Sequence, residues 1–249
     1  MKIEEAIASI LKKPLTEITI PSISNKESFL KELDIIVSCV EEPIHDFTFS
    51  ASYQLAKQAK KRNYKVMLSG MGADEIFAGY PRYTLVTISH ILKPFIFILN
   101  IILRKNHAFS RKVERFNSFF SEKKFINAYT ALIGYFSSKE VAQLLNDNTF
   151  QGRFETKINK LLKNKKFSPL KTALLMDFYG YLSHNFTVAD KSCMRHGVEL
   201  RVPFATKKLY EYITNLSQNE LIFLFQTKKP LKKLLKKFIP KKIINGKKI

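Results

Sequence analysis

The fold is decided by one stretch of the chain, Val66-Met67-Leu68-Ser69-Gly70-Met71-Gly72-Ala73-Asp74-Glu75-Ile76-Phe77-Ala78-Gly79-Tyr80. The β-prone run from Tyr64 to Leu68 predicts a short buried strand that ends at a glycine-containing loop. Gly70 and Gly72 allow backbone amides to approach a ligand, because no Cβ atom stands in the way. Asp74-Glu75 then opens a predicted helix, with carboxylates that can hold a divalent metal against phosphate. The arrangement is typical of a nucleotide site in an α/β sheet, although an ordinary strand-to-helix turn has the same spacing.

The residues before this stretch predict a parallel sheet. Apolar residues at helical spacing predict helices over residues 4–13, 29–40 and 50–62, and Ser24 with Glu27 fits a capping box before the second helix. Alternating polar and apolar residues predict a strand over residues 16–20. The order strand, helix, helix, strand is that of a crossover connection in a parallel sheet. We therefore expect a partial parallel α/β, nucleotide-binding part over residues 1–83.

The remaining residues, 84–249, predict helices and no strand. The apolar segment from Thr84 to Leu103 could suggest a membrane span, but Lys93-Pro94 divides it into pieces far shorter than the about twenty residues required. Helices are also predicted over residues 170–185 and 231–239, the second with lysines opposite its apolar stripe. The predicted fold class is α/β and predominantly helical, with a truncated parallel sheet followed by a helical C-terminal part.

Charge is distributed unevenly along the 249 residues, which carry a formal net charge of +21. Residues 1–83 contain 11 basic and 11 acidic side chains, so residues 84–249 carry the whole excess. Such an excess fits a surface for RNA or anionic membranes, and it also fits lysine-rich solvated helices around a core, which we favour. Hydrophobic content of 45% and two cysteines, Cys39 and Cys193, favour a globular protein of a reduced, cytoplasmic setting.

Four segments in order along the chain carry a resemblance to a known family. The segment Ser69–Glu75 followed by Gly79-Tyr80 closely resembles the second ATP-site motif of the asparagine synthase family. Further similar segments are Glu41-Glu42-Pro43, Asp190–Met194 with Glu199–Phe204, and Pro240–Lys248. The resemblance implies that the chain corresponds to the C-terminal synthetase domain of that family. The sheet would then be like that of PP-loop ATP pyrophosphatases and other adenine-nucleotide α-hydrolases. Both predicted parts, residues 1–83 and 84–249, would belong to this one domain.

The resemblance implies ATP-dependent amidation of a carboxylate, aspartate to asparagine, with AMP and pyrophosphate as products. It implies ATP and Mg²⁺ as cofactors, and as partners a small carboxylate substrate and a glutaminase domain or chain that supplies ammonia. Nucleic acid and membrane contacts are not expected. Ser69, Gly70 and Gly72 correspond to nucleotide-binding positions, Asp74 to a magnesium ligand and Lys248 to the catalytic lysine. Four residues of the downstream motif would shape the site or face the substrate: Asp190, Lys191, Glu199 and Arg201. The alternative is that they only form salt bridges.

The sequence departs from the family pattern in several places. Met71 and Thr206 replace acidic residues, which also makes an amidotransferase acting on a sugar acid of surface-polysaccharide pathways plausible. The pyrophosphate loop Ser-Gly-Gly-x-Asp-Ser does not occur, and Met1-Lys2 leaves no N-terminal cysteine for a glutaminase. We therefore expect a piece of a larger protein that is inactive by itself. A non-catalytic nucleotide-binding or partner subunit and a basic RNA- or membrane-binding protein are the alternatives.

Overall fold

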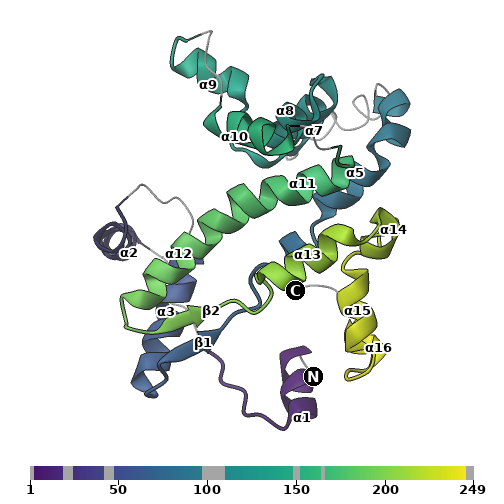
Figure 1. The fold of residues 1–249 in the computed structure, drawn as a ribbon. Helices are drawn as coiled ribbons and strands as arrows, with labels where there is room; N and C mark the ends of the chain where they lie inside the picture. Colours follow the sequence, from purple (N-terminus) through teal and green to yellow (C-terminus); the bar gives the residue numbers. More distant parts are fainter. Residues whose placement is uncertain are drawn as a thin grey trace. The chain divides into compact units, whose positions relative to one another are not determined.

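The structure, a computed structural model, describes residues 3–18, 25–41, 48–96, 110–147, 152–163 and 166–244. The predicted fold class is confirmed, because the described chain is mostly helical and contains a small parallel sheet (Figure 1). By contacts, the chain divides into two compact units. Unit 1 comprises Met1–Phe77, Tyr181–Leu221 and Lys228–Ile249, and unit 2 comprises Ala78–Gly180 and Ile222–Thr227. These units do not test the domain boundary predicted at residues 83 and 84, which stays a prediction.

Unit 1 contains two strands and most of the shorter helices. Its elements are α1 (Ile3–Leu11), α2 (Lys26–Cys39), α3 (Thr48–Lys61), β1 (Val66–Leu68), α4 (Ala73–Ile76), α12 (Ser183–Met194), β2 (Glu199–Arg201), α13 (Lys207–Asn215), α14 (Gln218–Leu221), α15 (Lys229–Leu235) and α16 (Lys241–Ile244). The helices predicted over residues 4–13, 29–40 and 50–62 are therefore confirmed as α1, α2 and α3.

The sheet of unit 1 joins two segments that are distant in sequence. β1 and β2 run parallel, and Val66, Met67 and Leu68 lie opposite Glu199, Leu200 and Arg201. Side chains alternate between the two faces of a strand, so Met67 and Leu200 share one face. That face packs on a core cluster in which Ala56 of α3 and Cys193 of α12 are fully buried. The long contact between α3 and α12 thus forms the base on which the sheet lies.

The described part of unit 2 consists of helices and of the turn Ile222–Thr227, where an isolated antiparallel bridge joins Phe223 and Gln226. Its elements are α5 (Pro81–Leu92), the 3₁₀ turn η1 (Lys93–Phe95), α7 (Ser110–Ser121), α8 (Phe125–Ile133), α9 (Ser138–Leu144), α10 (Arg153–Leu162) and α11 (Pro169–Asp177). A π-helical segment, η3 (Phe178–Leu182), continues from α11 directly into α12. No helix in the described ranges is long and apolar enough to cross a membrane.

A buried carboxylate organises the interior of unit 2. Asp177 is fully buried, and its Oδ2 atom accepts hydrogen bonds from Tyr83 (2.5 Å), Tyr129 (2.7 Å) and the guanidinium of Arg82 (2.9 Å). Burial raises the pKa of both tyrosines, and the negative charge of Asp177 raises it further. Burial alone would lower the pKa of Arg82, but its ion pair with Asp177 raises it overall. This network ties α5, α8 and α11 together.

Several sequence-based expectations were wrong. Residues 84–249 contain a strand, β2, because three residues with one apolar side chain leave no pattern to detect. β1 is not buried: Leu68 is 74% exposed and Val66 is 37% exposed. Thr16–Ile18 form no strand, and residues 19 and 20 lie outside the described ranges. The cap of α2 is Asn25, whose side chain accepts the N–H of Ser28 at 2.8 Å, in place of the predicted pair Ser24 and Glu27.

Candidate nucleotide-binding site

The glycine loop lies where both strands of unit 1 end. The backbone N–H of Ser69 donates to the carbonyl oxygen of Arg201 at 2.9 Å, so the parallel pairing extends one residue beyond β1. Parallel strands have their carboxyl ends at the same edge of a sheet. The pairing therefore brings the segment Ser69–Gly72 next to the segment that follows Arg201. Both segments carry part of the family resemblance in the sequence.

The conformation of the loop requires glycine at one position and leaves space at another. Gly72 has a φ of +88°, in the left-handed region that favours glycine, and a Cβ there would make only ordinary contacts with Ala205 and Leu182 at 3.7 Å. The requirement at Gly72 is therefore one of backbone conformation. Gly70 is exposed, and a Cβ built on it meets no atom within 4 Å. A ligand can approach the backbone of the loop at this residue.

The two acidic residues after the loop have different surroundings. Oδ1 of Asp74 lies 2.8 Å from Nζ of Lys228, and the two side chains are 20% and 24% exposed. Glu75 is only 3% exposed and belongs to the interior of unit 1. Both residues belong to the short helix α4. A turn leads into this helix, in which the N–H of Ala73 donates to the carbonyl oxygen of Gly70 at 3.3 Å. Asp74 is thus the carboxylate that remains accessible at the loop.

The remaining predicted site residues are held in ion pairs or lie elsewhere. Glu199 and Arg201 form an exposed ion pair at 2.9 Å, and the hydrogen bond from Arg201 lowers the pKa of Glu199. Lys191 pairs with Glu41, so the segments Asp190–Met194 and Glu41–Pro43 meet through this ion pair. Asp190 is exposed on α12. Lys248, Glu42 and Pro43 lie outside the described residues.

The chain is similar to proteins of one known family. The sequence pattern of the family described as asparagine synthase matches residues 6–249. The chain belongs to the asparagine synthase family. Asparagine synthetase (glutamine-hydrolyzing) 1 of Bacillus subtilis is 26% identical over 238 residues. That match covers 92% of this chain and 37% of the relative. A putative asparagine synthetase (glutamine-hydrolyzing) of Mycobacterium bovis is 24% identical over 242 residues, with 92% and 36% covered. No solved structure matches the chain.

The donor atoms at the loop Ser69–Gly72 fit a metal that is held partly by a nucleotide better than a metal held by protein ligands alone. No group of three or more His, Cys, Asp or Glu side chains lies together among the described residues. A cage made of protein ligands is therefore not formed in this part of the chain. Asp74 is a single carboxylate beside an open backbone, which suits Mg²⁺, since that ion is usually held by one or two carboxylates together with the phosphates of a nucleotide.

Sequence reasoning missed Lys228, which places a cation beside the loop. Lys228 has a φ of 55° and precedes α15, and its neighbour Lys229 points away to the carbonyl oxygen of Asn219. Both lysines lie in a lysine-rich segment, where no pattern distinguishes one from the next. Of the two positions where an acid is replaced, Thr206 has a structural role, because its hydroxyl caps α13. The substitution at Met71 has no structural explanation, since only its backbone N–H is held, by Oγ of Ser69 at 3.2 Å.

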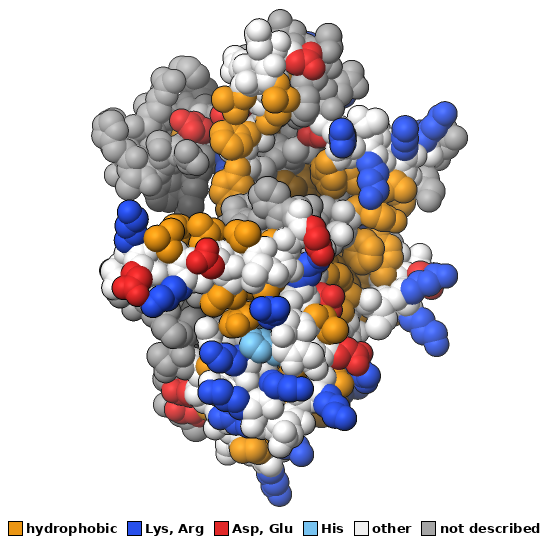
Figure 2. All heavy atoms as spheres, turned by 90° about the vertical axis from the view of Figure 1, so that its left-hand side faces the viewer, with side chains coloured by type: hydrophobic (Ala, Val, Ile, Leu, Met, Phe, Trp, Pro, Cys, Tyr) orange, Lys and Arg blue, Asp and Glu red, His pale blue; other side chains and the backbone are white. Residues whose placement is uncertain are grey.

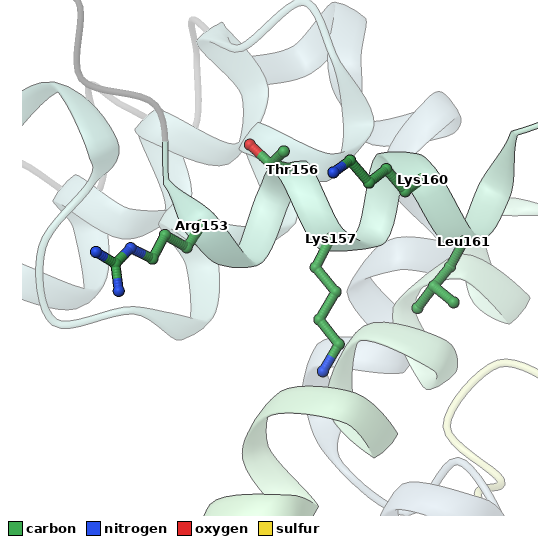
Figure 3. A pocket seen from close by; sticks show the side chains of 5 residues that line it. All are labelled: Arg153, Thr156, Lys157, Lys160 and Leu161. Atoms are coloured by element: carbon green, nitrogen blue, oxygen red, sulfur yellow. The ribbon is translucent and has the colours of Figure 1, made fainter.

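A surface pocket of unit 2 is formed by other residues. It is lined by Arg153, Thr156, Lys157, Lys160 and Leu161, all on α10 (Figure 3). Figure 3 shows Arg153 and Lys157 extending in different directions from the helix, so their cations do not converge on one point. On the face shown in Figure 2, lysine and arginine side chains are most frequent in the lower half, where acidic and apolar side chains lie between them. These arrangements suit solvated helix surfaces better than a phosphate site.

Proposed function

We propose that this chain forms the part of an asparagine-synthase-type ligase that binds the adenylate portion of ATP. The observation that carries the proposal is the position of the open turn Ser69–Gly72 at the common carboxyl edge of β1 and β2, fixed by the bond from Ser69 to Arg201. Ligands of open parallel α/β sheets bind at this edge. Family membership and the two matching segments on either side of the edge support the same assignment.

The proposed reaction is the amidation of a carboxylate in two steps. A carboxylate oxygen of the substrate attacks the α-phosphorus of ATP, and the bond to the β-phosphate breaks, giving an acyl-adenylate and pyrophosphate. Ammonia then attacks the acyl carbon, AMP leaves, and the proton released is taken up by the surroundings. We propose aspartate as the substrate and glutamine as the source of ammonia through a glutaminase domain or chain, because the printed names of the relatives are those of glutamine-hydrolyzing asparagine synthetases.

Each residue of the loop has a proposed role in that reaction. Ser69 and the backbone at Gly70 and Gly72 contact the nucleotide phosphate, where N–H groups can stabilise the charge that develops on its oxygens. Asp74 would hold Mg²⁺, which supplies positive charge against the phosphates when bound. Lys228 is placed to add a cation at the same loop. Lys248 remains a proposed catalytic residue that faces the departing pyrophosphate.

The chain lacks one component that the reaction needs. The sequence Ser-Gly-Gly-x-Asp-Ser, which carries backbone amides for the β- and γ-phosphates in this family, occurs nowhere in the 249 residues. Those phosphates are therefore left without their cradle in this chain. We propose that the chain by itself holds AMP and the α-phosphate of ATP and does not carry out the ligation. Its two thiols are unpaired, as a reduced cytoplasmic protein would have them.

Competition between nucleotides tests this function. We expect AMP and ATP to bind the purified chain with similar, weak affinity when Mg²⁺ is absent, because only the adenylate end is then contacted, and we expect Mg²⁺ to increase the affinity for ATP. Calorimetric titration of both nucleotides with and without Mg²⁺ measures this directly. GMP serves as the control for recognition of the base. A chain that binds neither AMP nor ATP contradicts the proposed site. Aspartate-dependent release of AMP from ATP by this chain alone contradicts the proposed incompleteness.

A further inference from the structure

An amphipathic segment of unit 1, residues 229–244, has no role in the proposed nucleotide site. We refer to it as the lysine segment, because it contains seven lysines and no acidic residue. It comprises α15, a turn and α16. The N–H of Lys236 donates to the carbonyl oxygen of Lys232 at 3.1 Å, and the N–H of Ile239 donates to that of Leu235 at 2.9 Å, so helical hydrogen bonding extends beyond α15.

The structure leaves part of the apolar stripe of this segment uncovered. No residue of α15 or α16 is buried. Leu231 and Leu235 are partly buried, whereas Leu234 and Phe238 are 52% and 67% exposed. A helix that covers a hydrophobic core turns its apolar stripe toward that core. Covering the core of unit 1 therefore accounts for Leu231 and Leu235 and does not account for Leu234 and Phe238.

A row of cations accompanies the exposed apolar row. Lys233 and Lys237 are exposed and lie four residues apart, as Leu234 and Phe238 do, and residues four apart are neighbours on a helix surface. Each lysine directly precedes a residue of the apolar row, so both rows reach solvent along the same turns of the helix. The lysine segment thus presents an apolar row and a positive row together.

The positive charge of the lysine segment is not neutralised within the described residues. The carboxylate near it is that of Glu220, whose pKa is lowered by hydrogen bonds from Ser217 and further by the charges of Lys229 and Lys233. Six lysines of the segment form no ion pair with a described carboxylate: Lys232, Lys233, Lys236, Lys237, Lys241 and Lys242. One nearby carboxylate leaves the segment strongly positive, and such a surface attracts anions.

The residue types of the segment favour an anionic membrane over a nucleic acid as the partner. Proteins that bind single-stranded nucleic acids stack bases on aromatic rings and arginines. The segment contains no Arg and no Tyr, and Phe238 is its one aromatic residue. An exposed leucine such as Leu234 adds nothing to a contact with phosphates. At a bilayer, the same side chain is stabilised by entering the boundary between headgroups and acyl chains.

We infer that the lysine segment binds the surface of an anionic phospholipid bilayer, with Leu234 and Phe238 entering the interface and the lysines among the headgroups. Helices with one apolar face and one lysine-rich face lie in the plane of such an interface. The segment would lie on the bilayer, since no helix in the described ranges is long and apolar enough to cross one. The family resemblance did not lead us to expect a membrane contact. The inference does not rest on the proposed function, because the segment contributes nothing to the loop Ser69–Gly72.

Sedimentation of the purified chain with lipid vesicles tests the inference. We expect vesicles of mixed phosphatidylserine and phosphatidylcholine to bind the chain at least about tenfold more tightly than phosphatidylcholine alone, because lysines near an anionic surface add to binding. Higher salt should weaken the binding, since it screens these charges. No nucleotide is present in the experiment.

Tryptophan fluorescence measures whether the apolar row enters the bilayer. The chain contains no tryptophan, so Leu234→Trp and Phe238→Trp each introduce a single reporter. With the mixed vesicles, we expect the emission of both to shift to shorter wavelength and to be quenched by lipids with brominated acyl chains. Phe136→Trp is the control, because Phe136 is 54% exposed and belongs to unit 2. Its emission should stay unchanged.

Two double variants with equal changes of charge test the location of the contact. We expect Lys233→Glu with Lys237→Glu to weaken binding to the mixed vesicles at least about tenfold, because both charges lie in the proposed contact. Lys57→Glu with Lys60→Glu alters two exposed lysines of α3 and should weaken binding much less. All four lysines are exposed, so the melting temperatures of both variants should stay close to that of the unchanged chain.

Five results would overturn the inference. The first three are the absence of binding to the mixed vesicles, equal losses in the two double variants, and reporter emission that vesicles leave unchanged. The fourth is retention of the chain on single-stranded RNA, but not on vesicles, which Lys233→Glu with Lys237→Glu abolishes. The fifth is self-association that Phe238→Ser abolishes, which would make a second copy of this chain the partner. None of these measurements uses ATP or AMP, so failure of this inference and failure of the proposed function give different results.

Discussion

The carboxylate of Asp74 and the ammonium group of Lys228 lie 2.8 Å apart, although they are distant in the sequence. Both side chains are mostly shielded from solvent, which makes their attraction stronger than that of a surface pair. Without a ligand, each neutralises the charge of the other. A nucleotide phosphate with its metal would offer each a new partner, the cation to the phosphate and the carboxylate to the metal. The pair is therefore suited to hold the loop ready for an anionic ligand.

Replacing Lys228 by methionine tests its proposed contact with the nucleotide. We expect Lys228→Met to lower the affinity for AMP by roughly tenfold, the effect of losing one charge-assisted hydrogen bond of about 1.5 kcal/mol. Stability should also fall, by about 1–3 kcal/mol, because the mostly shielded carboxylate of Asp74 loses its ion pair with Lys228. Lys229→Met is the matched control, because Lys229 contacts the carbonyl of Asn219. Titration calorimetry measures both affinities. Equal losses in the two variants would show that only general positive charge matters.

Asp74 and Glu75 should respond differently to loss of charge. We expect Asp74→Asn to abolish the increase in ATP affinity that Mg²⁺ causes, with a stability loss of about 1–2 kcal/mol from the weakened pair with Lys228. Glu75 is buried, so Glu75→Gln should lower the free energy of unfolding by about 1–3 kcal/mol and keep the effect of Mg²⁺. Urea unfolding and nucleotide titration separate the two results. If the two variants exchange these effects, Glu75 is the metal ligand.

The order of strand, turn and helix around the glycine loop could be predicted from the sequence, but the pairing of β1 with β2 could not. The run ending at Leu68, the glycine loop and the acids after it predict a strand, a turn and a helix, and the structure contains β1, the turn and α4 in that order. Local signals of this kind depend on residues close in sequence. β2 has three residues and one apolar side chain, too short for periodicity, and its role depends on pairing with a strand far away.

The failures share one physical cause, which is that burial depends on neighbours. An apolar run such as the one at Tyr64–Leu68 predicts burial only when other strands and helices cover it, and β1 is exposed because the described sheet has two strands. The pair of Asp74 and Lys228 arises in the same way, from tertiary contact. Sequence separated Asp74 from Glu75 only through the family resemblance, whereas burial separates them directly.

Alanine substitutions at the two glycines of the loop test two different properties. Gly72 tests the backbone conformation of the loop, and Gly70 tests the space through which a ligand would approach. We expect Gly72→Ala to lower the free energy of unfolding by about 1–2 kcal/mol, because a residue with a Cβ is strained in the left-handed region. Gly70→Ala should leave stability nearly unchanged, since its Cβ enters open space. It should weaken AMP binding severalfold if the ligand approaches through that space, as we propose. Chemical unfolding and calorimetry measure the two effects. A Gly70→Ala variant that binds AMP normally would place the nucleotide elsewhere.

Because of the network around Asp177, the stability of unit 2 should decrease at alkaline pH. The folded state raises the pKa of Tyr83 and Tyr129 above 10.0, by burial and by the charge of Asp177. The unfolded chain loses these two protons near pH 10, while the folded chain keeps them. The unfolded state then binds fewer protons, so the free energy of unfolding falls as pH rises above 10. Below pH 10 both states are protonated, and the stabilisation is present in full.

Urea unfolding between pH 8 and pH 11 tests this linkage with Tyr129→Phe. At pH 8 the variant should be less stable by about 1.5–3 kcal/mol, because a hydrogen bond to a buried carboxylate is lost. Above pH 10 the stability of the unchanged chain should fall by up to about 1.4 kcal/mol per pH unit for each of the two tyrosines. The variant loses only one of these contributions, so the two stability curves should converge as pH rises. Parallel curves would show that Tyr129 does not titrate differently in the folded and unfolded states.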